Sequence, residues 1–124
     1  MKKWHKNTPE GTRDLLYRAD SKKNEIESAL HALFQSHAFA GVRTPSFEFY
    51  DVYTTGSDVL PQENMYKLVD RHGRLLAMRA DTTAPIMRVV QTRLSDEALP
   101  LRFCYTQNVF RANYGLNGQR HEIT

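Results

Sequence analysis

The sequence predicts an α+β fold in which helices pack on an antiparallel sheet. Two segments have apolar residues at the three- and four-residue spacing of an amphipathic helix, and several short apolar segments are bounded by turn residues. The elements follow the order helix, strand, hairpin, helix, hairpin, so antiparallel connections dominate. A doubly wound parallel sheet, which alternates strands with helices, does not fit this order.

Length and composition fit a single globular domain. The chain has 124 residues, of which 40% are hydrophobic and 25% are charged, and a chain of this length buries roughly two thirds of its unfolded surface. The formal net charge of +3 comes from basic residues spread along the chain, with a small cluster at Lys2, Lys3 and Lys6. This excess is too small to indicate a nucleic-acid partner by itself.

The sequence also indicates a cytoplasmic protein. Its N-terminus lacks the apolar core of a signal peptide, and no stretch has the length of a membrane-spanning helix. Cys104 is the single cysteine, so a disulfide within the chain is excluded, and we expect the thiol to pack as a small apolar group. We therefore expect no membrane partner.

The first helix is expected after residues 1–19, a lead-in that contains turn residues. Asp20 or Ser21 can provide its N-cap, and Gly41 is expected to end it. The apolar residues that recur at helical spacing are Ile26, Ala29, Leu30, Leu33 and Phe34.

Residues 42–50 are predicted to form a half-buried strand, because Phe47 and Phe49 alternate with polar residues. Pro45 has no backbone N–H for a sheet hydrogen bond. We therefore expect this strand at the edge of a sheet or at an interface with another chain.

The next segments are predicted to be a loop and a hairpin. Residues 54–64 have turn residues and no periodicity, which is typical of a loop. Residues 65–70 and 74–79 are expected to be strands joined by residues 71–73. In that turn Gly73 would provide a positive φ.

The second helix is expected to begin at Asp81 or Thr82. Pro85 would lie in its first turn, where a missing backbone N–H is tolerated. The stripe that we expect to be buried contains Ile86, Val89, Val90 and Leu94.

The last part of the chain predicts a second hairpin. Residues 101–111 alternate like a strand, with a break expected near Gln107 and Asn108. Residues 114–118 are predicted to form a turn, and residues 120–124 the beginning of the returning antiparallel strand.

Three side chains form the candidate binding site: Asp81, Thr83 and Arg111. A carboxylate, a hydroxyl and a guanidinium near the ends of adjacent elements can hold the ammonium and carboxylate of a free amino acid. Each residue also has an ordinary structural role open to it. Asp81 is a favourable N-cap, Thr83 can bond the first helical turn, and Arg111 can form a surface salt bridge.

Metal and cofactor sites are not predicted. The five histidines lack the spacing of a zinc site. Gly115 and Gly118 form a lone glycine pair, without the Lys and Ser or Thr of a phosphate-binding loop, so we interpret them as turn residues. Spacing alone identifies no catalytic triad.

Several segments together resemble the catalytic core of class II histidyl-tRNA synthetases. They also resemble, more closely, the paralogous family of regulatory subunits of ATP phosphoribosyltransferase. The segments that carry the resemblance are residues 9–14, then the first predicted helix and the strand with Thr44 and Pro45, which resemble motif 1, and residues 110–111 and 118–123, which resemble motif 2. The resemblance implies a partial class II synthetase-like core.

The resemblance assigns roles to the candidate residues. Asp81 would take the α-ammonium of histidine with help from Thr83, and Arg111 would grip its carboxylate and, in a synthetase, the ATP α-phosphate. Gln119 and His121 would lie at the pocket rim. Motif 1 forms the dimer interface in this family, so a homodimer is expected.

Departures from the synthetase pattern favour the regulatory subunit. The run from Asp81 to Ile86 is similar to the regulatory form, and Asn113, Gln119 and His121 replace an acid and two arginines of synthetases. The resemblance thus implies a non-catalytic subunit with no cofactor, required by the short catalytic subunit and involved in feedback inhibition by L-histidine. A tRNA partner is not expected; the alternative is a fragment of histidyl-tRNA synthetase, an ATP-dependent tRNA ligase.

The resemblance also bears on how much of such a core is present. Residues 1–124 correspond to the N-terminal part of a class II core, with the motif 1 and motif 2 regions. Motif 3 would lie downstream. We therefore expect a fragment that is not catalytically competent alone, and whose histidine pocket lacks one wall.

Overall fold

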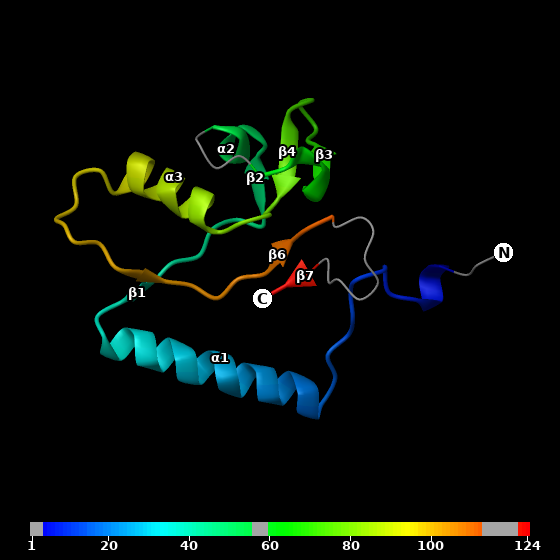
Figure 1. The fold of residues 1–124 in the computed structure, drawn as a ribbon, viewed down its shortest axis with the longest axis horizontal. Helices are drawn as coiled ribbons and strands as arrows, with labels where there is room; N and C mark the ends of the chain where they lie inside the picture. Colours follow the sequence, from blue (N-terminus) through cyan, green and yellow to red (C-terminus); the bar gives the residue numbers. More distant parts are fainter. Residues whose placement is uncertain (1–3, 56–59, 113–121) are drawn as a thin grey trace.

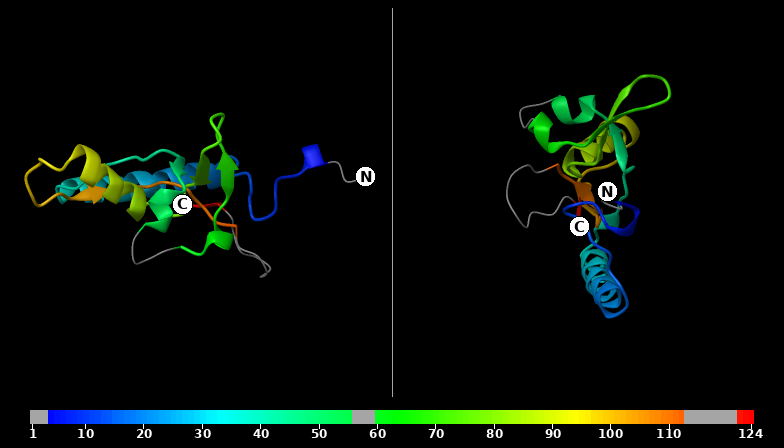
Figure 2. Two further views of the ribbon diagram at one scale, coloured as in Figure 1. Left: turned by 90° about the horizontal axis from the view of Figure 1, so that it is seen from above. Right: turned by 90° about the vertical axis from the view of Figure 1, so that its right-hand side faces the viewer.

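A computed structural model describes residues 4–55, 60–112 and 122–124 (Figure 1). One long helix, α1 (Arg18–Ser36), is set apart on one side of the molecule, as Figure 1 and the right-hand view of Figure 2 show. The paired strands β1 (Ala40–Gly41) and β5 (Phe103–Cys104) lie between α1 and the other helices. A short 3-10 turn, η1 (Trp4–Lys6), precedes α1.

The chain between β1 and β5 contains a three-stranded antiparallel sheet in the order β2–β4–β3. Its strands are β2 (Phe47–Phe49), β3 (Lys67–Val69) and β4 (Leu75–Met78). Two helices, α2 (Asp51–Thr54) and α3 (Thr83–Arg93), contact each other beside this sheet. The 3-10 turn η2 (Gln62–Asn64) comes before β3.

A second antiparallel pair joins β6 (Val109–Phe110) to β7 (Glu122–Ile123). The α+β class is confirmed, and antiparallel pairing dominates as predicted. The exception is the parallel pair β1–β5, in which Ala40 faces Phe103 and Gly41 faces Cys104. Parallel strands need a long crossover connection. Here the connection contains the whole three-stranded sheet together with α2 and α3.

The first predicted helix is confirmed, but both of its ends differ from the prediction. It begins at Arg18 after Tyr17, and no side chain caps it, so neither Asp20 nor Ser21 is the N-cap. It ends at Ser36 and not at Gly41. The reason is Ala38, whose φ of 62° turns the chain into the left-handed region, and this conformation ends helices.

Helix α1 has no buried residue among those described. Its apolar stripe is about half exposed: Ile26 by 51%, Leu30 by 45%, Leu33 by 53% and Phe34 by 37%. An amphipathic helix gains most of its stability when its apolar face packs against other parts of a protein. The described part of the chain covers this stripe only in part.

The predicted orientation of the strand at residues 42–50 is wrong. Phe47 and Phe49 are 49% and 46% exposed, whereas Glu48 between them is 6% exposed. The reason is an ion pair: the Arg88 Nη2 and Nε atoms donate to the two Glu48 carboxylate oxygens at 2.6 and 3.0 Å. Only residues 47–49 form the strand, and β2 lies at the sheet edge, as Pro45 predicted.

The predicted hairpin is confirmed. Its turn is fixed by Asp70, whose carboxylate accepts the backbone N–H groups of His72 at 2.8 Å and Arg74 at 2.9 Å. Gly73 has the predicted positive φ, at 78°.

Replacing Gly73 with alanine should destabilise the protein by about 1 kcal/mol, because a residue with a Cβ is disfavoured at this φ. Apart from the adjoining residues, no atom in the described part of the chain lies within 4 Å of the position that the Cβ would take, so steric contact adds nothing. Urea unfolding measures the effect. His72→Ala, at an exposed neighbouring position, is the control and should stay within about 0.5 kcal/mol of the parent. Equal stability of the two variants would contradict the prediction.

Helix α3 is confirmed, with Pro85 fully buried in its first turn. Along its predicted stripe Ile86 is buried, and Val89, Val90 and Leu94 are half-buried. A core cluster of Tyr53, Met65, Ala77 and Ala80 lies between α2, β4 and the segment that leads to α3.

The predicted break between β5 and β6 is also confirmed. The Gln107 side chain turns to Thr44, accepting its backbone N–H at 2.8 Å and donating to its hydroxyl at 3.1 Å. In the described part of the loop predicted at residues 54–64, which omits residues 56–59, the structure has the end of α2 and the turn η2. The turn predicted at residues 114–118 lies outside the described residues.

Candidate functional site

Asp81 and Thr83 lie at the start of α3, where the chain leaves β4. The Asp81 Oδ2 atom accepts the backbone N–H groups of Thr83 at 3.0 Å and of Ala84 at 3.3 Å. Asp81 thus satisfies two of the unpaired donors that begin every helix. Thr82 takes the formal N-cap position, and its side chain makes no cap bond.

The Asp81 carboxylate also has an oxygen to spare. Among the described residues, its hydrogen bonds all go to Oδ2, so Oδ1 is left to accept a further donor. The structural role and a binding role therefore use different oxygens. Thr83, two residues along, is exposed at the same helix terminus.

Arg111 follows β6 directly and contacts the chain next to Asp81. Its Nε atom donates to the carbonyl oxygen of Ala80 at 3.3 Å. Neither terminal nitrogen of the guanidinium makes a hydrogen bond to a described residue. These two nitrogens are therefore available to bind a carboxylate.

A small cavity lies against Arg111. It measures about 60 Å³ and is lined by Leu60, Asn64, Met65, Ala80 and Arg111. This is room for a few water molecules, since each takes about 30 Å³ in the liquid. The structure therefore brings Arg111 against the backbone beside Asp81, with Thr83 one step further along. Gln119 and His121, the other two predicted residues, lie outside the described residues.

Tyr53 supports this site, although the sequence did not single it out. Its side chain is 3% exposed, and its hydroxyl donates to the Asp81 carbonyl at 3.2 Å. Burial, reinforced by the Glu48 charge, raises the pKa of Tyr53 to about 12. The hydroxyl is therefore a protonated donor at neutral pH.

Arg79 is the second residue that sequence reasoning missed. It is 5% exposed, and its guanidinium donates to three backbone carbonyls. The Nε atom reaches Asn108 O at 2.8 Å, and Nη1 reaches Thr44 O at 2.9 Å and Pro45 O at 3.0 Å. The available signal was a charged residue directly after the apolar run of β4.

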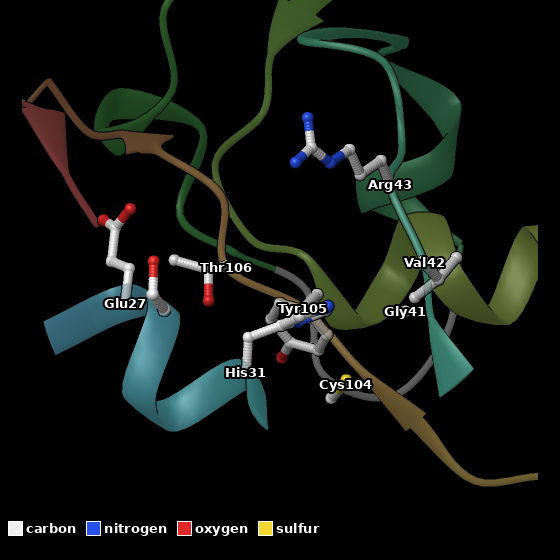
Figure 3. Close-up of a pocket in the computed structure, with 9 residues that line it drawn as sticks. Glu27, His31, Gly41, Val42, Arg43, Cys104, Tyr105 and Thr106 are labelled. Carbon is white, nitrogen blue, oxygen red and sulfur yellow. The ribbon is translucent and has the colours of Figure 1, made fainter. Parts of the chain in front are cut away.

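A larger groove lies elsewhere, between α1 and the β1–β5 pair (Figure 3). It measures about 500 Å³, and its lining includes Glu27 and His31 of α1 and, from the segments of the strand pair, Arg43, Tyr105 and Thr106. Figure 3 shows Arg43 and Glu27 at opposite sides of the groove, so these charges do not pair. Among the described residues no group of histidine, cysteine and acidic side chains could hold a metal ion.

No helix in the described ranges is both long enough and apolar enough to cross a membrane. Residues 11–124 match the sequence profile of the family described as histidyl-tRNA synthetase. The chain belongs to the histidyl-tRNA synthetase family.

Curated relatives of this synthetase-family chain are similar along its whole length. It is 48% identical over 124 residues to the ATP phosphoribosyltransferase regulatory subunit of Clostridium kluyveri, covering 100% of this chain and 32% of the relative. It is 44% identical over 124 residues to the protein of that name from Clostridium botulinum strain Langeland, covering 100% of this chain and 29% of the relative. The chain thus spans about a third of the length of these relatives.

Solved structures agree with the class II histidyl-tRNA synthetase-like fold that the resemblance predicted. A Bacillus halodurans protein described as an ATP phosphoribosyltransferase regulatory subunit/histidyl-tRNA synthetase superposes with a TM-score of 0.81 at 34% identity, over 94% of this chain and 30% of its own. The apo histidyl-tRNA synthetase of S. aureus gives a TM-score of 0.72 at 26% identity, over 85% of this chain and 29% of its own.

Proposed function

We propose that residues 1–124 form the N-terminal part of a regulatory, non-catalytic subunit of ATP phosphoribosyltransferase. The subunit would switch on a short catalytic subunit in the first step of histidine biosynthesis and take part in feedback inhibition by L-histidine. The observation that carries the proposal is the 48% identity, along all 124 residues, to a protein named as such a subunit. Identity to the S. aureus synthetase is lower, at 26%.

The geometry around Asp81 supports histidine as the effector. Among the described residues, the Asp81 Oδ1 atom and the terminal nitrogens of Arg111 make no hydrogen bond; the first suits an ammonium group and the second a carboxylate. Asp81 follows Ala80 in the chain, Arg111 donates to the Ala80 carbonyl, and Thr83 is exposed two residues after Asp81. Such a site recognises the two charged groups that every free amino acid carries, and Gln119 and His121 are proposed for its rim.

Inhibition by histidine requires more than binding. A ligand shifts an equilibrium only when it binds one state more tightly than the other. In this proposal the states are two arrangements of the complex with the catalytic subunit. Histidine would prefer the less active one.

A homodimer through the motif 1 region is part of the proposal. Two features support it: the half-exposed stripe of α1 and the edge strand β2 with its exposed Phe47 and Phe49. Both offer apolar surface that a second copy of the chain would cover. A cytoplasmic location completes the proposal, supported by the buried thiol of Cys104.

Reconstitution with a short catalytic subunit tests the function. We expect the complete subunit that contains residues 1–124 to switch on phosphoribosyl transfer from PRPP to ATP, and L-histidine to inhibit the assembled complex. Pull-down of the catalytic subunit should accompany the activity. Absence of both assembly and activation would exclude the regulatory role.

A synthetase role is the second candidate, favoured by Arg111, which matches the motif 2 arginine, and by the structural similarity to the S. aureus enzyme. It predicts histidine-dependent exchange between ATP and pyrophosphate and a tRNA partner. Asn113, Gln119 and His121 weigh against it, because they replace charged residues of synthetases. A stand-alone amino-acid-binding module would show histidine binding with neither the exchange nor the catalytic partner.

A further inference from the structure

We propose that Arg79 is a positioning residue that fixes the separation of Asp81 and Arg111. It would thereby make the site selective for a ligand that carries both an ammonium and a carboxylate. This inference deepens the proposed function and rests on it.

The backbone of Arg79 already joins two segments of the fold. Its N–H donates to Ser46 O at 2.8 Å, and its carbonyl oxygen accepts the N–H of Phe110 at 2.8 Å. Asp81 lies two residues after Arg79, and Arg111 lies one residue after Phe110. Arg79 is therefore the junction between the two halves of the site.

The side chain of Arg79 connects the same segments a second time. Its guanidinium reaches Asn108 O on the strand side of Arg111, and Thr44 O and Pro45 O before β2. Five hydrogen bonds from one residue thus hold three chain segments in register. Without the guanidinium, the direct bonds between the two halves of the site would be the Phe110 N–H to Arg79 O bond and the long 3.3 Å bond from Arg111.

Stability alone does not account for a guanidinium at this position. Arg79 is 5% exposed, and among the described residues no carboxylate lies within ion-pair distance of it. Removing a charge from water is unfavourable, and an apolar side chain of similar volume would often fill such a site equally well. The fork geometry, which lets one side chain bond three carbonyls, is the property that an apolar residue cannot reproduce.

The separation of Asp81 and Arg111 matters only to a ligand that touches both. L-Histidine carries an ammonium and a carboxylate, histamine carries the ammonium alone, and imidazole propionate carries the carboxylate alone. A variant that merely lowers the population of the folded site weakens all three ligands by the same factor. A change in separation weakens histidine selectively.

Calorimetric titration of the complete subunit with these three ligands tests the inference. In Arg79→Lys we expect histidine binding to weaken roughly tenfold more than histamine binding. Arg88→Lys is the control, because the Arg88 guanidinium also makes hydrogen bonds to another part of the fold, but its two bonds go to Glu48 and to neither half of the site. It should change the three affinities by a common factor. A common factor in Arg79→Lys as well would overturn the inference.

Hydrogen exchange of the ligand-free protein provides a second test that does not depend on histidine. Residues 80–84 and 108–112 should exchange faster in Arg79→Lys, and in Arg79→Met if that variant folds, than in the parent or in Arg88→Lys. Unchanged exchange in both segments would overturn the positioning role. If the parent protein binds no histidine but exchange rises as expected, the proposed effector is wrong and the role of Arg79 stands.

Discussion

Asp81→Asn should weaken histidine binding by roughly 30-fold or more while the protein keeps its stability. The asparagine amide oxygen can still accept the N–H groups of Thr83 and Ala84 that Oδ2 accepts now. The negative charge that would hold an ammonium is lost, and a hydrogen bond to a charged group contributes about 1.5–3 kcal/mol. Inhibition of the assembled complex by histidine should disappear at concentrations that inhibit the parent, and activation of the catalytic subunit should be retained.

Two further variants separate charge from capping. Asp81→Ala should lose histidine binding and also about 1 kcal/mol of stability, because the cap is removed. Asp70→Asn is the matched control, since the Asp70 carboxylate likewise accepts two backbone N–H groups, but in the hairpin turn. It should leave histidine affinity unchanged. Inhibition that survives in Asp81→Asn would remove the assigned role of Asp81.

Arg88→Ala should destabilise the protein by about 3 kcal/mol, as measured by urea unfolding. The substitution leaves the Glu48 carboxylate, whose side chain is 5% exposed, without its partner. Glu48→Ala should cost less, because the Arg88 side chain is 33% exposed and can reach water when its partner is removed. The difference in stability between the two variants follows from the burial of the charged group that remains. Both variants remove the ion pair itself, so its length does not distinguish them.

An exposed ion pair on the same sheet provides the control. The Arg74 Nε atom lies 2.7 Å from Asp70 Oδ2, and the Arg74 side chain is 58% exposed. The Asp70 side chain is 16% exposed, but without the Arg74 side chain its carboxylate keeps the backbone N–H groups of His72 and Arg74 as donors. Arg74→Ala should therefore cost below about 1 kcal/mol. The double variant Glu48→Ala with Arg88→Ala should be more stable than the sum of the single effects predicts, since it leaves no charge unpaired. Strict additivity would show that the two side chains do not interact.

The sequence predicted best the elements that are fixed by local chemistry. Gly73 marks a turn that requires positive φ, Pro85 fits the first turn of a helix, and Pro45 keeps β2 at an edge. The break before β6 was visible in the pattern around Gln107. Its cause was not, because the bonding partner Thr44 lies 63 residues away.

The orientation of β2 could not be predicted in the same way. Alternation defines two faces of a strand but does not say which face meets the core. Aromatic side chains normally point inward, yet Glu48 is buried because Arg88, 40 residues later, neutralises it. The end of α1 was misplaced for a similar reason, since Ala38 adopts a left-handed conformation that its residue type does not favour.

In the candidate site, too, residue type predicts some residues, whereas others depend on partners that are distant in the sequence. Asp81, Thr83 and Arg111 were predicted as site residues because their residue types suit a zwitterion and because their segments resemble a known family. Tyr53 and Arg79 were missed, since the groups that they bond are backbone carbonyls. A carbonyl has the same chemistry at every position, so no residue type in the sequence reveals such a partner.

The parallel pairing of β1 with β5 has a consequence for the order of folding. Ala40 meets Phe103, so this contact closes a chain segment of about 60 residues. Closing a long segment costs entropy before the contact returns any stabilisation, whereas the hairpin β3–β4 closes over a short turn. The hairpin can therefore assemble early on the folding pathway, and α1 is tethered to the rest through β1 only in a late step.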